Sequence, residues 1–154
     1  MITDKTELYI QKCLPPAPKI SAEIGLYFNY DFPVECLSKT IGLNPSEAQI
    51  PSLTRINPIS GRHNSGYWIY HIGEDTSYDC KALFQSIEKL LSENVDNFTS
   101  AIRQYHPECI LLRLYVDVED ENEYPSIRLH SDLLNLLAKI QASFDIVIEN
   151  NYGT

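Results

Sequence analysis

The chain has 154 residues, which fits one domain, and its 44% hydrophobic and 21% charged residues are close to globular averages. This composition argues against a disordered, collagen-like or membrane-embedded protein. The net charge of −9 repels nucleic acid and anionic lipid and attracts basic molecules. We therefore expect one folded domain that binds neither nucleic acid nor membranes.

The sequence contains no pattern typical of a targeting or membrane-spanning segment. Charged and polar residues interrupt the first thirty residues before a signal-peptide-like apolar run can form. The longest later apolar run, residues 109–118, falls well short of the roughly 20 residues of a membrane helix. Four cysteines lie far apart and lack the spacing of a zinc site, as expected for reduced thiols. We expect a cytoplasmic protein without a metal or another cofactor.

The first segment in chain order is interpreted as an N-terminal arm, residues 1–20, and residues 21–154 as a single domain. The arm ends in the proline-rich segment 15–18, which cannot continue a helix and favours an extended conformation. Its apolar residues 8–10 either dock on the domain or belong to a loosely held terminus, and the sequence leaves both readings open.

Alternating apolar residues over 24–30 predict the first strand, with one buried face. Pro33 then gives a helix-start signal, and Gly42 suits the left-handed residue that ends a helix. Three prolines and two glycines follow within residues 44–66, which predicts a long irregular loop. Loops of this length in compact domains are often functional.

The second half of the chain alternates strands and helices. Aromatic and β-branched residues predict a strand over 67–72, and apolar residues at steps of three or four predict a helix over 84–105, with a possible break at 92–96. The apolar run 109–118 is typical of a central strand. An acidic turn at 119–123 then predicts a hairpin with a strand over 126–130, followed by a helix from 131 and a last strand over 144–148.

This order predicts an α+β fold with one mixed sheet of about five strands packed against helices. A ferredoxin-like or related split βαβ arrangement satisfies the preference for right-handed crossovers. The chain also resembles the bacterial family DUF4279 through the sequence YFNYDFP at 27–33, IGLNPS at 41–46 and FDIVI at 144–148. The resemblance implies a bacterial origin and this layout, and it brings no activity, cofactor or catalytic residue.

The candidate catalytic motifs lack the residues that would carry out the chemistry. Residues 61–66 have the glycine spacing of a phosphate loop, but Tyr67 follows where lysine and then serine or threonine must bind phosphate and Mg²⁺. The histidines lack metal-ligand spacing, and no serine lies in a nucleophile elbow. The carboxylates of 119–123 form one solvated run instead of a pair in unlike environments. The absence of a complete motif favours a non-enzymatic role and leaves the question of an activity open.

A polar sheet face is the remaining candidate for a site. If the even-numbered residues of 110–118 face the helices, then Arg113, Tyr115 and Asp117 share the opposite face. The same parity on the predicted neighbouring strand adds Arg128 and His130. Such a face binds a ligand or a protein in some domains, although a half-solvated antiparallel sheet shows the same pattern without any function.

Two functional hypotheses follow. The first is a non-enzymatic interaction protein, in its specific form an immunity-type protein that masks a basic partner. Tyr67, Trp68 and Tyr115 serve as aromatic anchors in this hypothesis if they are exposed. The alternative is a small-molecule-binding domain or cryptic enzyme. In this alternative the loop 44–66 covers the sheet and contacts an anionic ligand through Arg55, Arg62 and His63.

Overall fold

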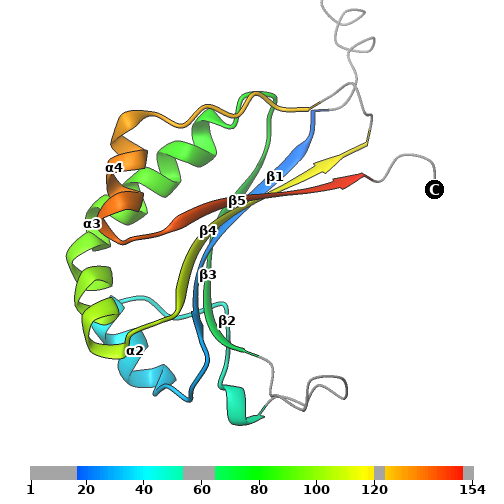
Figure 1. Ribbon diagram of the computed structural model, residues 1–154. Helices are drawn as coiled ribbons and strands as arrows, with labels where there is room; N and C mark the ends of the chain where they lie inside the picture. Colours follow the sequence, from blue (N-terminus) through cyan, green and yellow to red (C-terminus); the bar gives the residue numbers. More distant parts are fainter. Residues whose placement is uncertain (1–16, 54–64, 120–123, 151–154) are drawn as a thin grey trace, which may run out of the picture.

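The computed structural model describes residues 17–53, 65–119 and 124–150 (Figure 1). These residues form five strands, three α-helices and one 3-10 turn. In chain order they are β1 (Lys19–Phe28), α2 (Val34–Ile41), β2 (Glu47–Gln49), η1 (Pro51–Leu53), β3 (Gly66–Thr76), α3 (Lys81–Tyr105), β4 (Cys109–Val118), α4 (Ser131–Lys139) and β5 (Ser143–Asn150).

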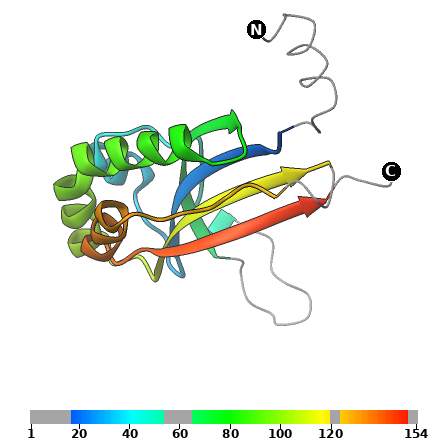
Figure 2. The ribbon, with the colours of Figure 1, turned by 90° about the horizontal axis from the view of Figure 1, so that it is seen from above.

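The five strands form one mixed sheet in the order β2-β3-β1-β4-β5. The first three pairings are antiparallel, and β5 pairs parallel to β4. All three helices lie on the same face of the sheet, and no described helix covers the other face (Figures 1 and 2). The predicted α+β class with one mixed sheet is confirmed.

The connections are those of a split βαβ arrangement. Strands β3 and β4 run parallel, are joined by α3, and have β1 inserted between them. Strands β1 and β2 are related in the same way through α2, with β3 between them. Together these six elements make the ferredoxin-like βαββαβ pattern. Helix α4 and strand β5 extend it by one further βαβ unit beyond β4.

The hydrophobic core lies between the sheet and the helices, because alternate residues of the central strands face that side. Five such residues of β1 and five of β4 are at most 5% exposed: Ile20, Ala22, Ile24, Leu26, Phe28, Ile110, Leu112, Leu114, Val116 and Val118. The apolar stripe of α3 meets them through Leu83, Phe84, Ile87, Leu91, Phe98 and Ala101. The predicted parity of residues 110–118 is confirmed.

Helix α3 runs without a break through residues 92–96, where the sequence leaves a kink open. Its polar side chains bond to carbonyls of their own helix instead of competing with its backbone: the Ser92 hydroxyl donates to Lys89 and the Asn94 amide donates to Leu90. Leu91 and Phe98 are fully buried on either side of this stretch. Packing against the sheet therefore outweighs the weak helix propensity of these residues.

Trp68 belongs to the core, so its predicted role as an exposed aromatic anchor is wrong. It pairs across the sheet with Leu26, and both side chains face the helices with no exposed surface. The indole Nε1 donates to the Ser38 hydroxyl of α2 at 3.0 Å, and the ring packs edge-on against Phe98 at 6.4 Å between centroids. The strand parity that places Tyr67 on the other face necessarily turns Trp68 inward.

The predicted strand over 126–130 is also wrong. Residues 124–130 form no strand, and the backbone N–H of Ser126 instead bonds to the carbonyl of Tyr78, just before α3. The reason is that β1 and β5 occupy both sides of β4, so no hydrogen-bonding edge remains for a hairpin partner. Ile127 and Leu129 still pack partly against the core, which accounts for the alternating pattern of this segment.

The boundaries of two other predicted segments also change. The predicted loop 44–66 contains the three-residue strand β2, which is bracketed by Pro45 and Pro51 and too short for its alternation to be seen. Strand β1 begins at Lys19, inside the segment interpreted as an arm, whereas residues 1–16 lie outside the described residues. The predicted left-handed Gly42 is confirmed, with φ 83° and its N–H bonded to Ser38.

Candidate functional site

The face of the sheet opposite the helices is the candidate site, and we call it the open face. Strands β1 and β3 bend so that this face is concave in the view of Figure 1. Strand parity and register place on it Lys19, Ser21, Glu23, Gly25 and Tyr27 of β1, Glu47 and Gln49 of β2, Tyr67, Ile69, His71, Glu74 and Thr76 of β3, Cys109, Leu111, Arg113, Tyr115 and Asp117 of β4, and Ser143, Asp145, Val147 and Glu149 of β5.

Arg113 lies at the centre of the open face in a row of charges that crosses three strands. The register pairs Arg113 with Glu23 on one side and with Asp145 on the other. Its Nη1 lies 3.9 Å from Glu23 Oε1 and its Nε lies 3.4 Å from Asp145 Oδ2. The Nε contact lacks the alignment of a hydrogen bond, so it is an ion pair only.

Tyr115 completes this cluster, because its hydroxyl donates to Glu23 Oε1 at 2.9 Å and accepts from Arg113 Nη1 at 3.5 Å. The hydrogen bond with Tyr115 raises the pKa of Arg113, which keeps the guanidinium charged. Since two carboxylates already neutralise that charge, Arg113 fixes the geometry of neighbouring side chains and has little capacity left to attract an anion.

Two tyrosines of the open face remain protonated donors at neutral pH. Burial is the main cause that raises the pKa of both Tyr27 and Tyr115. The ring of Tyr27 lies directly over Gly25, where a Cβ atom would come within 2.8 Å of the ring. Gly25 therefore makes room for the Tyr27 ring to lie flat against the sheet and to reach toward the Arg113 cluster.

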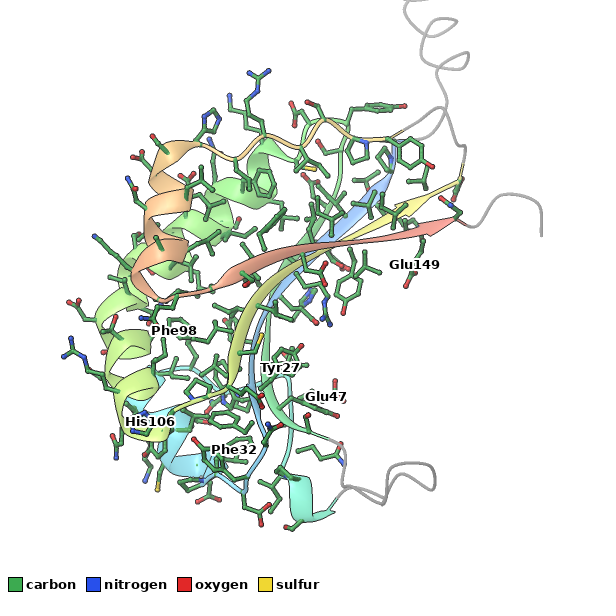
Figure 3. The ribbon with its side chains drawn as sticks, viewed as in Figure 1. Tyr27, Phe32, Glu47, Phe98, His106 and Glu149 are labelled. Carbon is green, nitrogen blue, oxygen red and sulfur yellow. The ribbon has the colours of Figure 1, made fainter. Side chains whose placement is uncertain are left out.

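Tyr67, predicted as a binding residue, is half-buried on the open face near the edge strand β2. Its hydroxyl lies 2.7 Å from Glu47 Oε1 and 3.0 Å from Gln49 Oε1. The hydrogen bond to Glu47 is the main cause that raises the pKa of Tyr67. In Figure 3 the side chains of Tyr27 and Glu47 lie on the side of the sheet away from the helices, whereas Phe98 lies between the sheet and α3.

The end of the open face formed by the last residues of β4 and β5 is strongly acidic. A hollow of about 790 Å³ lies there, lined by Tyr115, Lys19 and the carboxylates Glu74, Asp75, Asp117 and Glu149. Among residues 17–53, 65–119 and 124–150, no group of three or more His, Cys, Asp or Glu side chains is placed to hold a metal ion. This end of the open face therefore concentrates negative charge.

The structure unites some of the predicted site residues and separates others. Tyr67, Arg113 and Tyr115 share the open face. Arg128 and His130 do not, because their segment is not a strand of the sheet; they line a separate hollow with Asp79, Lys81, Phe84, Gln85, Glu88 and Ser126. Arg55, Arg62 and His63 lie outside the described residues.

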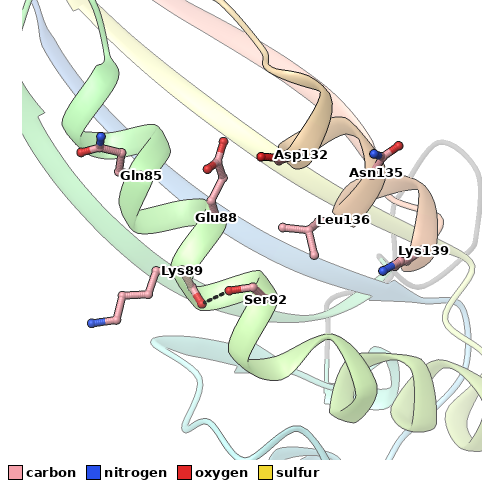
Figure 4. Close-up of a pocket in the computed structure, with 8 residues that line it drawn as sticks. All are labelled: Gln85, Glu88, Lys89, Ser92, Asp132, Asn135, Leu136 and Lys139. Carbon is pink, nitrogen blue, oxygen red and sulfur yellow. Dashed lines mark hydrogen bonds between the residues drawn. The ribbon is translucent and has the colours of Figure 1, made fainter.

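A further hollow, of about 640 Å³, lies between α3 and α4 (Figure 4). Its lining side chains are Gln85, Glu88, Lys89, Ser92, Asp132, Asn135, Leu136 and Lys139. All of them are exposed or half-buried, and they carry charges of both signs. The hollow is an open groove between two surface helices.

Sequence reasoning missed Glu23, Tyr27 and Asp145, which complete the Arg113 cluster. Their signal is the same alternation that places Arg113 and Tyr115, because Glu23 and Tyr27 also stand at odd positions in a strand whose even positions are apolar. The alternation of β5 is equally visible in the sequence. Only the register, which brings the three strands side by side, was missing.

The chain matches a protein-family model over nearly the same residues as the sheet and its helices. A family described as "Domain of unknown function (DUF4279)" matches residues 18–151, from one residue before β1 to one residue after β5. The chain belongs to the DUF4279 family. The resemblance noted in the sequence is therefore confirmed, and the DUF4279 unit includes the complete sheet with all three helices. Comparisons with curated proteins and with solved structures gave no match.

Within the described part of this DUF4279 domain, no helix combines the length and the apolar character required to cross a bilayer. The three described cysteines are free thiols: Cys36 is exposed, Cys109 is partly exposed and Cys80 is buried. Burial, followed by the nearby Asp79 and Asp75, raises the pKa of Cys80 to about 11.

We expect the described thiols to react in the order of their exposure. At pH 8 a thiol-alkylating reagent should modify Cys36 rapidly, whereas Cys80 stays protonated and shielded and should react only when the domain unfolds. Mass spectrometry of tryptic peptides after timed alkylation measures the order. A control in urea should abolish the difference, and early modification of Cys80 in the folded protein would contradict its placement in the core.

Proposed function

We propose that this DUF4279 domain is a non-enzymatic binding protein whose open face docks a basic protein in the cytoplasm of a bacterium. Its specific form is an immunity-type protein that masks the partner. The observation that carries this proposal is the charge of the open face, where the carboxylates Glu23, Glu47, Glu74, Asp117, Asp145 and Glu149 outnumber the basic side chains Lys19 and Arg113.

Two physical effects support docking at this face. Its negative potential accelerates the encounter with a positively charged partner and disfavours acidic competitors. The partly buried rings of Tyr27, Tyr67 and Tyr115 add rigid apolar area with a polar tip, which is typical of residues that contribute most to binding. Cross-strand hydrogen bonds already hold Tyr67 and Tyr115, so little side-chain entropy of these two residues is lost when a partner binds.

The chemistry of the open face favours binding over catalysis. The raised pKa values of Tyr27 and Tyr115 make both phenols poor bases at neutral pH, and Arg113 is held by two carboxylates. The small-molecule alternative depends on Arg55, Arg62 and His63. These residues lie outside the described part of the chain, so that alternative gains no support from a described contact.

A charge-reversal experiment tests the proposal. The wild-type domain, the open-face variant Glu47→Lys/Glu74→Lys and the control variant Glu93→Lys/Asp96→Lys on α3 are used to capture proteins from the native host, and mass spectrometry identifies what each retains. All four carboxylates are exposed, so both variants should fold and they carry the same net charge. We expect a protein of isoelectric point above about 9 on the wild type and on the control.

The same protein should be lost from the open-face variant and at high salt, and after purification it should bind that variant at least about tenfold more weakly than wild type. Recovery of no basic protein at low or high salt would contradict the proposal. Equal retention by the open-face variant would show that another surface carries the binding.

A further inference from the structure

The two edges of the sheet differ in how they are protected against pairing with another strand. An exposed edge presents unpaired backbone N–H and C=O groups, and proteins usually blunt it by shortness, lysine, proline, a bulge or a covering segment. The edge strand β2 has three residues, too few to template a partner. The opposite edge strand, β5, has eight residues and pairs on one side with β4.

Strand β5 has fewer protective features, and the charges of Asp145 and Glu149 are the ones that its sequence supplies. Its sequence SFDIVIEN contains no lysine or proline, and its register with β4 is regular from Ser143 to Asn150. Figures 1 and 2 show β5 running along the outer edge of the sheet, past the end of α4. Beyond α4 its helix-side residues Ile146 and Ile148 are 39% and 49% exposed. Among the described residues, no strand pairs with its outer side.

We propose that β5 pairs antiparallel with β5 of a second copy of this chain, about a two-fold axis at Ile146. This pairing doubles the five-stranded sheet into one continuous sheet. The interface is isologous, so the same strand serves both partners, as is usual in homodimers. The inference concerns the edge of the sheet and is independent of what the open face binds.

The side chains of β5 decide the register. With the axis at Ile146, the two Ile146 residues face each other and Phe144 faces Ile148 on the helix side. On the open face Asp145 then faces Val147, and Ser143 faces Glu149. Each cross-strand pair is apolar, or has a charge on one side only.

The neighbouring registers are less favourable. An axis at Val147 places Asp145 opposite Glu149, and this repulsion occurs twice because the interface is symmetric. An axis at Asp145 brings the two Asp145 carboxylates together. An axis at Ile148 shortens the overlap and places Ile146 opposite Asn150. Only axes that pass through a residue are compared, because a two-fold axis perpendicular to the sheet keeps the helices of both copies on the same side. An axis between two residues would pair side chains that point to opposite faces.

This geometry has two consequences. The open faces of both copies lie on the same side and form one larger acidic surface. The interface is at the small end for protein complexes, so we expect reversible association in the micromolar range. Because each copy carries a net charge of −9, salt should strengthen the dimer, whereas it should weaken binding of a basic partner. The opposite effects of salt therefore allow an experiment to contradict one proposal without contradicting the other.

Sedimentation velocity of the full chain from low to high micromolar concentration tests the pairing. We expect a concentration-dependent dimer in wild type and monomers for Ile146→Lys and Ile148→Lys, because a lysine at either position opposes edge pairing. The matched control is Leu134→Lys on α4, which replaces a side chain that is 48% exposed and should leave the dimer unchanged. Circular dichroism verifies that each variant is folded.

Cysteine cross-linking tests the axis. In a background with Cys13, Cys36 and Cys109 replaced by serine, Ile146→Cys should form an intermolecular disulfide, because the two Cβ atoms face each other at about 5 Å. Ile148→Cys should not link to its own copy, since it faces Phe144. A wild-type protein that stays monomeric, a dimer that survives Ile146→Lys, or a cross-link at position 148 instead of 146 would overturn the proposal.

Discussion

Replacing Trp68 by alanine is expected to lower the free energy of unfolding by about 3–5 kcal/mol, the largest effect that we expect from one substitution in this domain. The indole is fully buried between β3 and the helices, where it touches Phe98 and bonds to Ser38. Its removal leaves a cavity that the surrounding helices fill only in part. Because a domain of this size is stable by about 5–15 kcal/mol, the variant should approach the limit of folding.

Urea denaturation followed by far-UV circular dichroism measures this loss, and the next residue provides a matched control. Tyr67 is also a large aromatic residue of β3, but it lies half-buried on the open face and bonds to Glu47. Tyr67→Ala should therefore cost only about 1 kcal/mol. Equal losses at positions 67 and 68 would contradict the assignment of the two faces.

The parts of the fold that depend on local chemistry were predictable from the sequence. The alternation of β4 identifies which of its residues are buried, and the apolar stripe of α3 identifies its packing face, because both periods follow from backbone geometry alone. Gly42 is predictable for the same reason, since only glycine adopts the left-handed conformation there without strain.

The wrong strand prediction arises because two segments that are distant in the sequence compete for the same place in the sheet. Residues 126–130 have the alternation of a strand, but β5, which follows later in the chain, pairs with the edge of β4 that they would need. A parallel strand joined by α4 offers eight paired residues, from Ser143 to Asn150. Strand β2 was missed for the opposite reason, since three residues between two prolines carry no periodic signal.

The candidate site was predictable in part for the same physical reason. Arg113 and Tyr115 could be assigned to a polar face by parity, but their partners Glu23 and Asp145 come from strands that are 90 residues earlier and 32 residues later than Arg113. Parity assigns a residue to a face, and only register assigns its neighbours on that face. The sequence therefore indicated an arginine available for a ligand, whereas the structure pairs it with two carboxylates.

The second prediction concerns this pairing. Replacing Arg113 by leucine is expected to lower the free energy of unfolding by about 2 kcal/mol, because Glu23 keeps its charge in a partly buried position and loses its cationic neighbour. The loss should stay below that of a fully buried ion pair, since the side chains of Arg113 and Glu23 are 25% and 17% exposed. Asp145 is more exposed, and water should compensate for most of its lost contact.

A double-mutant cycle separates this pairing from the other roles of the two residues. Glu23→Leu alone should cost about 1 kcal/mol, because Arg113 keeps Asp145 as a partner. Combining it with Arg113→Leu removes both charges and leaves two apolar side chains facing each other across β1 and β4, so the double variant should lose less than the sum of the single losses. We expect a coupling energy of about 1 kcal/mol from urea denaturation. Strict additivity would mean that the two residues do not act as a pair and that the open face owes its order to the tyrosines instead.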